Sequence, residues 1–476
     1  MKVFFPPLKR GAKKLVALRR RGSRRALGIA AATAILAVLG AGSLAASGAE
    51  SLGKLEKELR QAISRRQTSR ALELASALAE TGAPKAYKIL IQRCLNGDSY
   101  TLEKRVGQLL VECKDPETRA LVAAELGSRQ MPTYKRRIIL LAVAARMAED
   151  PQMLAAIHGT LRDPSRAVVL TALGWMCKLR KKDFVEPLIK ALQIREQRPR
   201  DRVYFDILKA LREITNADME QAADWKNYAK GQKSSPNAKP KKQSLTVLHR
   251  PSFFEVALDT DRMLFLIDVS DSMKRRDEFI EEGPRQGGRR GPTAGSKTKV
   301  AKDDKENEKE QKKKEGQRTG ALGPERARLA RVKAELVRVI KQLGSRTRFG
   351  VVSFSHEIKW MGDTKALKLA SADNKAEAMA WVRSLAPSGA TRTDLALQEA
   401  FRADVDTIYL LTDGAPKDTN DTRLPIGKIL RQTKQANRFL RRRIHTVSFL
   451  GVKDSSMRTF VKTLAEQNDG ECKLLP

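Results

Sequence analysis

The chain has 476 residues, too many for a single hydrophobic core, which indicates two or three domains. Its composition (41% hydrophobic, 5% aromatic) is that of a globular protein, and four scattered cysteines and four histidines disfavour a disulfide framework or a Cys/His metal cluster. A formal net charge of +37 favours anionic surfaces, but no nucleic-acid-binding module accompanies it, so nucleic acid is a disfavoured partner.

The N-terminus has the pattern of a targeting signal. Residues 1–25 contain ten Lys or Arg and no acid, and residues 26–49 contain no charge. An apolar helix of about 20 residues can cross a bilayer. We therefore expect a basic cytoplasmic leader at 1–25 and a transmembrane anchor at 26–49, with the remainder across the membrane. The alternative is that 26–49 is a signal segment, because the small residues near position 49 could form a cleavage site for signal peptidase.

Residues 50–230 repeat apolar positions at three- and four-residue spacing, which predicts consecutive amphipathic helices. Asp-Pro steps at Asp115, Asp150 and Asp163 indicate helix starts with Asp as the N-cap. The sequence segments that begin at Asp115 and Asp163 are similar to each other. They start 48 residues apart, which is near the length of a helical-pair repeat. This region resembles a degenerate HEAT-type solenoid, with an irregular helical bundle as the alternative.

Residues 231–245 are rich in Lys, Ser and Pro and are predicted to be a linker. In residues 246–476 short apolar runs alternate with amphipathic stretches, which predicts a mostly parallel sheet covered by helices on both faces. The charged, apolar-poor stretch 274–325 is expected to be a disordered insertion. The expected strands are 263–267, 349–354, 407–412 and 444–450, and the expected helices are 326–343, 374–385, 393–402, 426–441 and 457–467.

Oxygen-bearing side chains follow two of these strands. Asp268, Ser270 and Ser272 come directly after one strand, Asp413 follows another, and Thr391 lies in a glycine-containing loop. Ligands of open α/β sheets bind at the carboxyl ends of strands, so these side chains are expected to converge. Oxygen donors without His or Cys favour a hard cation, Mg²⁺ first, with Mn²⁺ or Ca²⁺ as alternatives.

This pattern resembles the metal-ion-dependent adhesion site of von Willebrand factor type A domains, over roughly residues 253–475. The resemblance implies one divalent cation, held partly through water, whose open position takes a carboxylate from a protein partner. With its helical region, the chain resembles bacterial proteins that pair HEAT-like repeats with a C-terminal type A domain. The matching residues are Asp268, Ser270, Ser272, Thr391 and Asp413.

One position departs from the family pattern. Residue 271 is often glycine in the family and is Asp271 here. Its carboxylate either points to solvent or adds negative charge beside the cation.

Catalysis is not expected. Ser355 and His356 adjoin, but no acid is placed to orient the imidazole and no nucleophile elbow is present. The sequence also contains no phosphate-binding loop, HExxH motif or dinucleotide-binding turn.

The predicted fold class is therefore α plus α/β, a helical solenoid followed by a doubly wound, mostly parallel sheet. The predicted function is cation-dependent binding of a protein by a single-pass protein of the bacterial inner membrane, or by a periplasmic or secreted form after cleavage. The alternative is a structural scaffold in which the helical repeats bind the partner and the metal only stabilises the type A domain. A third hypothesis is that the positive charge of the chain binds a polyanion, in which case the binding affinity should fall strongly with salt concentration.

Overall fold

A computed structural model describes residues 44–197, 200–231, 251–275, 327–362, 364–420, 422–449 and 455–475. The predicted leader, all but the last six residues of 26–49, and almost all of the predicted linker and insertion lie outside these ranges. None of the described helices has both the length and the apolar character needed to span a bilayer. The chain forms two compact units, Met1–Ile89 and Leu90–Pro476.

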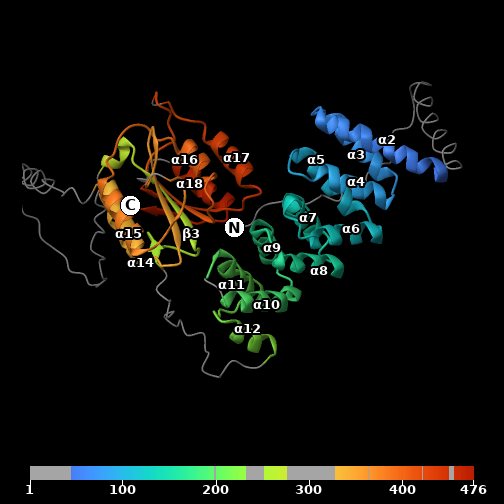
Figure 1. The fold of residues 1–476 in the computed structure, drawn as a ribbon, viewed down its shortest axis with the longest axis horizontal. Coiled ribbons are helices and arrows are strands. Elements are labelled where there is room, and N and C mark those ends of the chain that lie inside the picture. Colours follow the sequence, from blue (N-terminus) through green and yellow to red (C-terminus); the bar gives the residue numbers. More distant parts are fainter. Residues whose placement is uncertain are drawn as a thin grey trace, which may run out of the picture. The chain divides into compact units, whose positions relative to one another are not determined.

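The N-terminal half of the described chain is helical, as predicted (Figure 1). In the second unit five helices pack on the helix two places further along: α5 on α7, α7 on α9, α9 on α11, α6 on α8 and α10 on α12. This is how consecutive helical pairs stack when each buries one apolar stripe. The helices are α2 (Leu44–Ser64), α3 (Thr68–Glu80), α4 (Pro84–Cys94), α5 (Tyr100–Glu112), α6 (Pro116–Gly127), α7 (Tyr134–Arg146), α8 (Pro151–Gly159), α9 (Arg166–Leu179), α10 (Val185–Glu196), α11 (Arg202–Thr215) and α12 (Ala222–Ala229).

Two of the three predicted aspartate caps are confirmed. Asp115 accepts the Thr118 amide at 2.7 Å and begins α6, and Asp150 accepts the Gln152 amide at 2.9 Å and begins α8. The prediction for Asp163 was wrong, because the N-cap of α9 is Ser165. The Asp163 carboxylate instead forms a buried ion pair with Arg137 at 2.6 Å.

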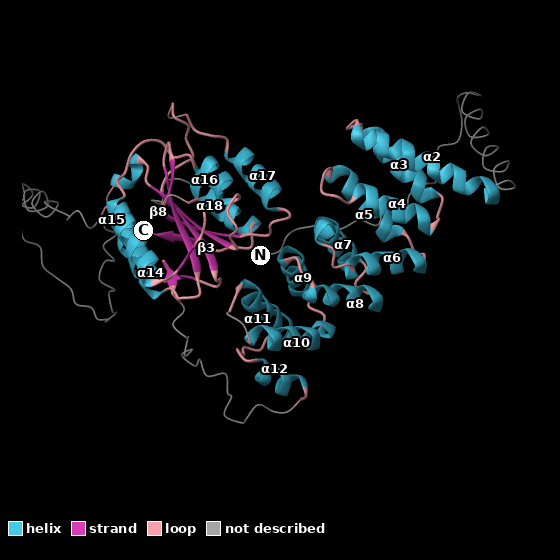
Figure 2. Ribbon diagram, in the orientation of Figure 1, coloured by secondary structure: helices cyan, strands magenta, loops and turns pink. Residues whose placement is uncertain are grey.

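The C-terminal half is a sheet with strand order β5-β4-β3-β7-β8-β9, and β6 pairs with β4 (Figure 2). Strands β4, β3, β7, β8 and β9 are parallel, whereas β5 and β6 run antiparallel to β4. The predicted mostly parallel sheet is thus confirmed. The strands are β3 (Arg262–Asp268), β4 (Arg348–Phe354), β5 (Ile358–Trp360), β6 (Lys368–Leu369), β7 (Thr407–Thr412), β8 (Arg443–Phe449) and β9 (Cys472–Leu475), with a separate hairpin of β1 (Ser252–Phe253) and β2 (Val256–Ala257).

Helices cover both faces of the sheet (Figure 1). Because successive side chains of a strand point to opposite faces, Phe265 and Ile267 belong to one buried core, and Leu264 and Leu266 belong to the other. The first core also includes residues of α14 (Arg328–Gln342) and α15 (Ala372–Ser384). The second includes residues of α16 (Thr393–Ala400), α17 (Ile426–Asn437) and α18 (Ser455–Gln467).

The four predicted strands and five predicted helices are all present, with ends shifted by a few residues. Five strands of two to four residues each were not predicted: β1, β2, β5, β6 and β9. Segments this short carry no readable periodicity.

Candidate metal centre

The candidate site lies at the carboxyl edge of the two central strands. Strands β3 and β7 are neighbours, and Ile267 is in register with Leu411. The residues that follow, Asp268 on β3 and Asp413 just after β7, therefore emerge at the same level of the sheet. Both carboxylates are buried, Asp268 completely.

The DxSxS loop connects these two strand ends through hydroxyl groups. The Ser270 and Ser272 hydroxyls lie 3.0 Å apart, and the Ser272 hydroxyl donates to Asp413 Oδ1 at 2.5 Å. Thr391 lies at the same place, because a Cβ built on Gly414 would be 3.2 Å from Ser272 Oγ and 3.3 Å from Thr391 Oγ1. The structure thus brings together the five residues predicted from the sequence.

Asp268 is the most constrained of the five residues. Its Oδ1 accepts the Ser270 amide at 2.8 Å, and its Oδ2 accepts the Thr412 hydroxyl at 2.6 Å. Burial raises the pKa of Asp268 to about 7, and the nearby Asp413 carboxylate adds to the increase. Two carboxylates this close and this deeply buried favour a cation between them.

Arg328 is a part of the site that sequence reasoning missed. It is the first residue of α14, and its guanidinium contacts Asp413 Oδ2 at 2.9 Å. The carboxylate is fully buried and the arginine side chain is only 13% exposed. No sequence motif predicts this contact, because Arg328 is 85 residues from Asp413 in the sequence.

The Asp271 carboxylate is largely exposed and has two partners. Its Oδ2 accepts the Gly389 amide at 3.1 Å, and its Oδ1 accepts from the Lys274 ammonium at 2.5 Å. The Asp271 amide in turn donates to the Gly389 carbonyl at 3.0 Å. The exposed carboxylate therefore ties the DxSxS loop to the loop that carries Thr391, and the hydrogen bond from Lys274 lowers its pKa.

Gly389 is required at its position. Its φ is +72°, and a Cβ there would lie 2.1 Å from His356 Nδ1. Only glycine combines this backbone conformation with so close an approach of a side chain. The His356 ring therefore packs against the Thr391 loop, and its Nδ1 lies 3.3 Å from the Ser355 hydroxyl.

The donor set fits a hard cation. It consists of two carboxylates and three hydroxyls, with neither sulfur nor imidazole, which is the chemistry that Mg²⁺ and Mn²⁺ prefer. Within the described ranges no group of three or more His, Cys, Asp or Glu residues is placed to hold a metal. Cation binding at this edge would thus depend on the three hydroxyls as well as on Asp268 and Asp413.

Comparisons with known proteins agree with the fold. Residues 324–473 match the family model described as von Willebrand factor type A domain. This match begins after the DxSxS motif. A segment of 150 residues is 31% identical in sequence to the human von Willebrand factor A domain-containing protein 3B. The matched segment makes up 31% of this chain and 10% of that protein. The chain thus spans about a tenth of the length of this curated relative.

Similar solved structures include two bacterial proteins. A von Willebrand factor type A protein from Catenulispora acidiphila is 16% identical, with a TM-score of 0.29 over 45% of this chain and 38% of that chain. The PilB minor pilin from Streptococcus sanguinis is 15% identical, with a TM-score of 0.27 over 45% of this chain and 56% of that chain. The family-model match and the parallel sheet together identify residues 324–473 as part of a von Willebrand factor type A domain.

Proposed function

We propose that the type A domain holds one divalent cation, Mg²⁺ or Mn²⁺, and uses it to bind a carboxylate of a protein partner. The observation that carries the proposal is the connection of the DxSxS loop to Asp413 through the Ser272 hydroxyl, with Thr391 beside it. Domains of this family generally mediate protein–protein interactions, which supports a binding role rather than a catalytic one.

In this proposal the two carboxylates and the three hydroxyls have different roles. Asp268 and Asp413 would supply the negative charge, partly through water, and Ser270, Ser272 and Thr391 would supply neutral oxygens. Few charged ligands leave the cation strongly electrophilic, so an incoming carboxylate completes its coordination favourably. Part of the domain's own charge is already balanced, because Arg328 contacts Asp413.

Further parts of the proposal rest on the sequence. Residues 26–49 would anchor the protein in a bacterial inner membrane, with the HEAT-like helical region and the type A domain outside the cytoplasm. Cleavage after this segment would release the same two parts into the periplasm or the medium. The stacking of α5, α7, α9 and α11 supports the solenoid part of this proposal.

Calorimetric titration of the chain with Mg²⁺ or Mn²⁺ tests cation binding. We expect a saturable heat for the wild type and none for Asp268→Ala. The matched control is Asp373→Ala, which removes an exposed carboxylate at the start of α15 and should leave the heat unchanged. Equal heats for the wild type and Asp268→Ala would count against the site.

An affinity pull-down with and without chelator tests the partner. We expect capture that chelator and Thr391→Ala both abolish, whereas Thr459→Ala, on the exposed side of α18, leaves it intact. Capture that ignores chelator but is lost on substitution of helical surface residues would instead support the scaffold alternative. Capture that collapses at modest salt and ignores chelator would indicate charge-driven polyanion binding.

A further inference from the structure

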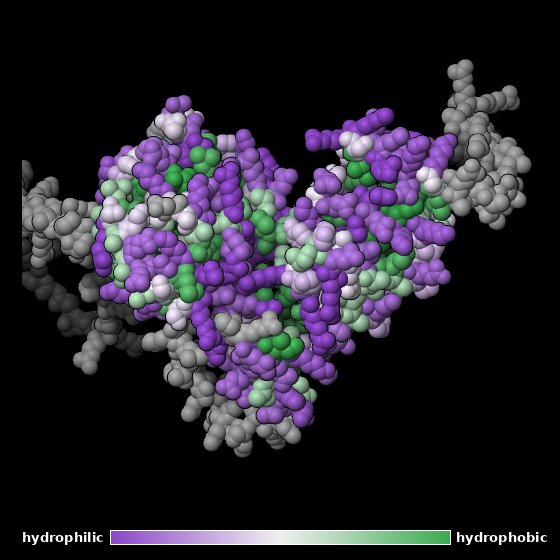
Figure 3. Space-filling view, viewed as in Figure 1, coloured by the Kyte–Doolittle hydropathy of each residue, from purple (hydrophilic) through white to green (hydrophobic). Residues whose placement is uncertain are grey.

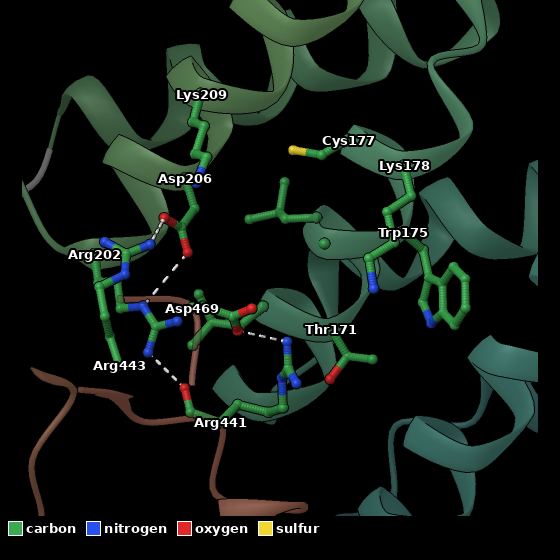
Figure 4. Close-up of a pocket in the computed structure, with 13 residues that line it drawn as sticks. Thr171, Trp175, Cys177, Lys178, Arg202, Asp206, Lys209, Arg441, Arg443 and Asp469 are labelled. Atoms are coloured by element: carbon green, nitrogen blue, oxygen red, sulfur yellow. Dashed lines mark hydrogen bonds and ion pairs between the residues drawn. The ribbon is translucent and has the colours of Figure 1, made fainter. Parts of the chain in front are cut away.

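A second candidate site lies at the opposite edge of the sheet, within the second compact unit. A cavity of about 280 Å³ is lined by α9, α11, the start of β8 and the turn before β9 (Figure 4). Its volume suits a small ligand. The cavity is separate from the DxSxS site. Strand β8 begins beside the cavity at Arg443 and ends at the opposite edge of the sheet at Phe449.

The lining of this cavity is strongly cationic. Five of its residues are Lys or Arg and two are Asp, and Asp259 also pairs with the lining residue Arg443, so five positive charges face three negative ones and an excess of two remains. The cationic residues are Lys178, Arg202, Lys209, Arg441 and Arg443.

The two acidic residues are already paired. Asp206 contacts Arg443 and lies 3.4 Å from Arg202 Nε, and Asp469 accepts from Arg441 at 2.7 Å. Neither carboxylate is therefore free to neutralise the lysines. In the part of the chain that the structure describes, Lys178 and Lys209 form no ion pair, and the Lys178 ammonium lies over the Trp175 ring, 4.9 Å from its centroid.

The buried arginines retain unused hydrogen-bonding capacity. Arg202 and Arg443 are 1% and 5% exposed, yet Arg443 Nε has no hydrogen-bond acceptor, and Arg202 Nε has only the Asp206 carboxylate, 3.4 Å away and not in hydrogen-bond geometry. Buried donors without partners are costly, and guanidinium groups bind oxyanions through paired N–H donors. Arg202, Arg443 and Lys209 also contribute, after burial, to lowering the pKa of His445 to about 3, which marks a positive potential at this place.

We propose that this cavity binds a small, multiply charged oxyanion. Phosphate and carboxylate groups share the required chemistry, and a ligand with either would neutralise Lys178 and Lys209 together. Because α9 and α11 form one wall and Arg441 to Arg443 the other, such a ligand would join the helical region to the type A domain. Figure 3 shows a largely hydrophilic surface on the face of the protein that it presents.

Calorimetric titration of the full chain with pyrophosphate and, separately, with citrate tests the proposal. Both titrations are done at fixed ionic strength on protein and buffers freed of divalent cations by a chelating resin, so the proposed cation site contributes nothing and no soluble chelator competes with the probes. We expect saturable binding of at least one probe, and which one binds distinguishes a phosphate from a polycarboxylate ligand. The double variant Lys178→Gln/Lys209→Gln should bind at least tenfold more weakly.

The matched control is Lys226→Gln/Lys230→Gln, which removes the same charge from exposed positions at the end of α12. It should bind like the wild type. Equal weakening in both double variants would show a general charge effect, and no binding of either probe at millimolar concentration would show that there is no site; either result overturns the proposal. Far-ultraviolet circular dichroism of each variant verifies that the fold is retained.

Discussion

The two edges of the C-terminal sheet are built in opposite ways. At the amino edge arginines are paired with carboxylates: Arg443 contacts both Asp206 and Asp259, and Arg166 pairs with Asp406 at 2.8 Å. At the carboxyl edge the two buried carboxylates accept from hydroxyl groups, Asp268 from Thr412 and Asp413 from Ser272, and Arg328 contacts only Asp413 of the two.

This difference follows from what each edge contacts. The amino edge packs against α9 and α11, so its charges are desolvated and must be compensated within the protein. The carboxyl edge carries the loops, where incompletely balanced charge favours a ligand. The buried ion pairs of the amino edge thus stabilise the protein and leave Lys178 and Lys209 for an anion, whereas the carboxyl edge is suited to binding a cation.

The largest expected effect comes from breaking the amino edge. Arg443→Leu leaves Asp206 and Asp259 buried without their partner, which should lower the free energy of unfolding by about 3–5 kcal/mol. Chemical denaturation measures this loss. Arg431→Leu, at an exposed position on α17, is the control and should change stability by about 0.5 kcal/mol or less. A loss as small for Arg443→Leu would mean that the network is not stabilising.

Acid should weaken the same edge through His445. Burial and the neighbouring arginines lower the pKa of its imidazole to about 3, so below pH 6.5 the unfolded chain takes up a proton that the folded chain does not. Stability should therefore fall as the pH falls, by at most about 2 kcal/mol between pH 7 and pH 5.

The measurement is the pH dependence of unfolding for the wild type and for His445→Asn. The asparagine carbonyl can accept the Glu471 amide that His445 Nδ1 now accepts at 3.1 Å. The variant should show a shallower dependence on pH. Parallel curves for the two proteins would contradict a neutral buried imidazole.

At the carboxyl edge, Arg328→Ala should strengthen cation binding. The guanidinium competes with a cation for Asp413, so its removal should raise the affinity for Mg²⁺ roughly tenfold, or ~1.4 kcal/mol. Arg331→Ala, three residues along α14, is the comparison for loss of one positive charge. A weaker affinity in Arg328→Ala would show that the arginine positions Asp413 instead.

The smallest effect is expected for Asp271→Ala. This change removes the hydrogen bond to the Gly389 amide but leaves all five candidate ligands in place. Cation affinity should fall by a few fold, about 1 kcal/mol or less, because the Thr391 loop is held less firmly. Asp271→Asn, which can still accept from Gly389, should restore most of the affinity. If alanine strengthened binding, the negative charge of Asp271 would be the dominant factor.

The sequence alone predicted the class of fold and the order of its elements. Apolar spacing distinguished the helical region from the alternating strands and helices, because a buried strand such as β7 is apolar throughout and an amphipathic helix such as α14 repeats its apolar positions. The five oxygen-bearing residues were also named in advance, since strand ends and a motif identify them.

Only the tertiary structure revealed which charges meet. Arg328 reaches Asp413 across 85 positions, and Arg443 reaches Asp206 across 237. Neither pairing has a local pattern, because ion pairs between distant segments depend on how the helices and sheet pack. The same is true of Asp163, whose Asp-Pro step resembled a cap while its carboxylate is held by Arg137. A sequence thus shows which side chains carry charge or oxygen ligands, whereas the packing of the helices and the sheet determines which distant residue each of them contacts.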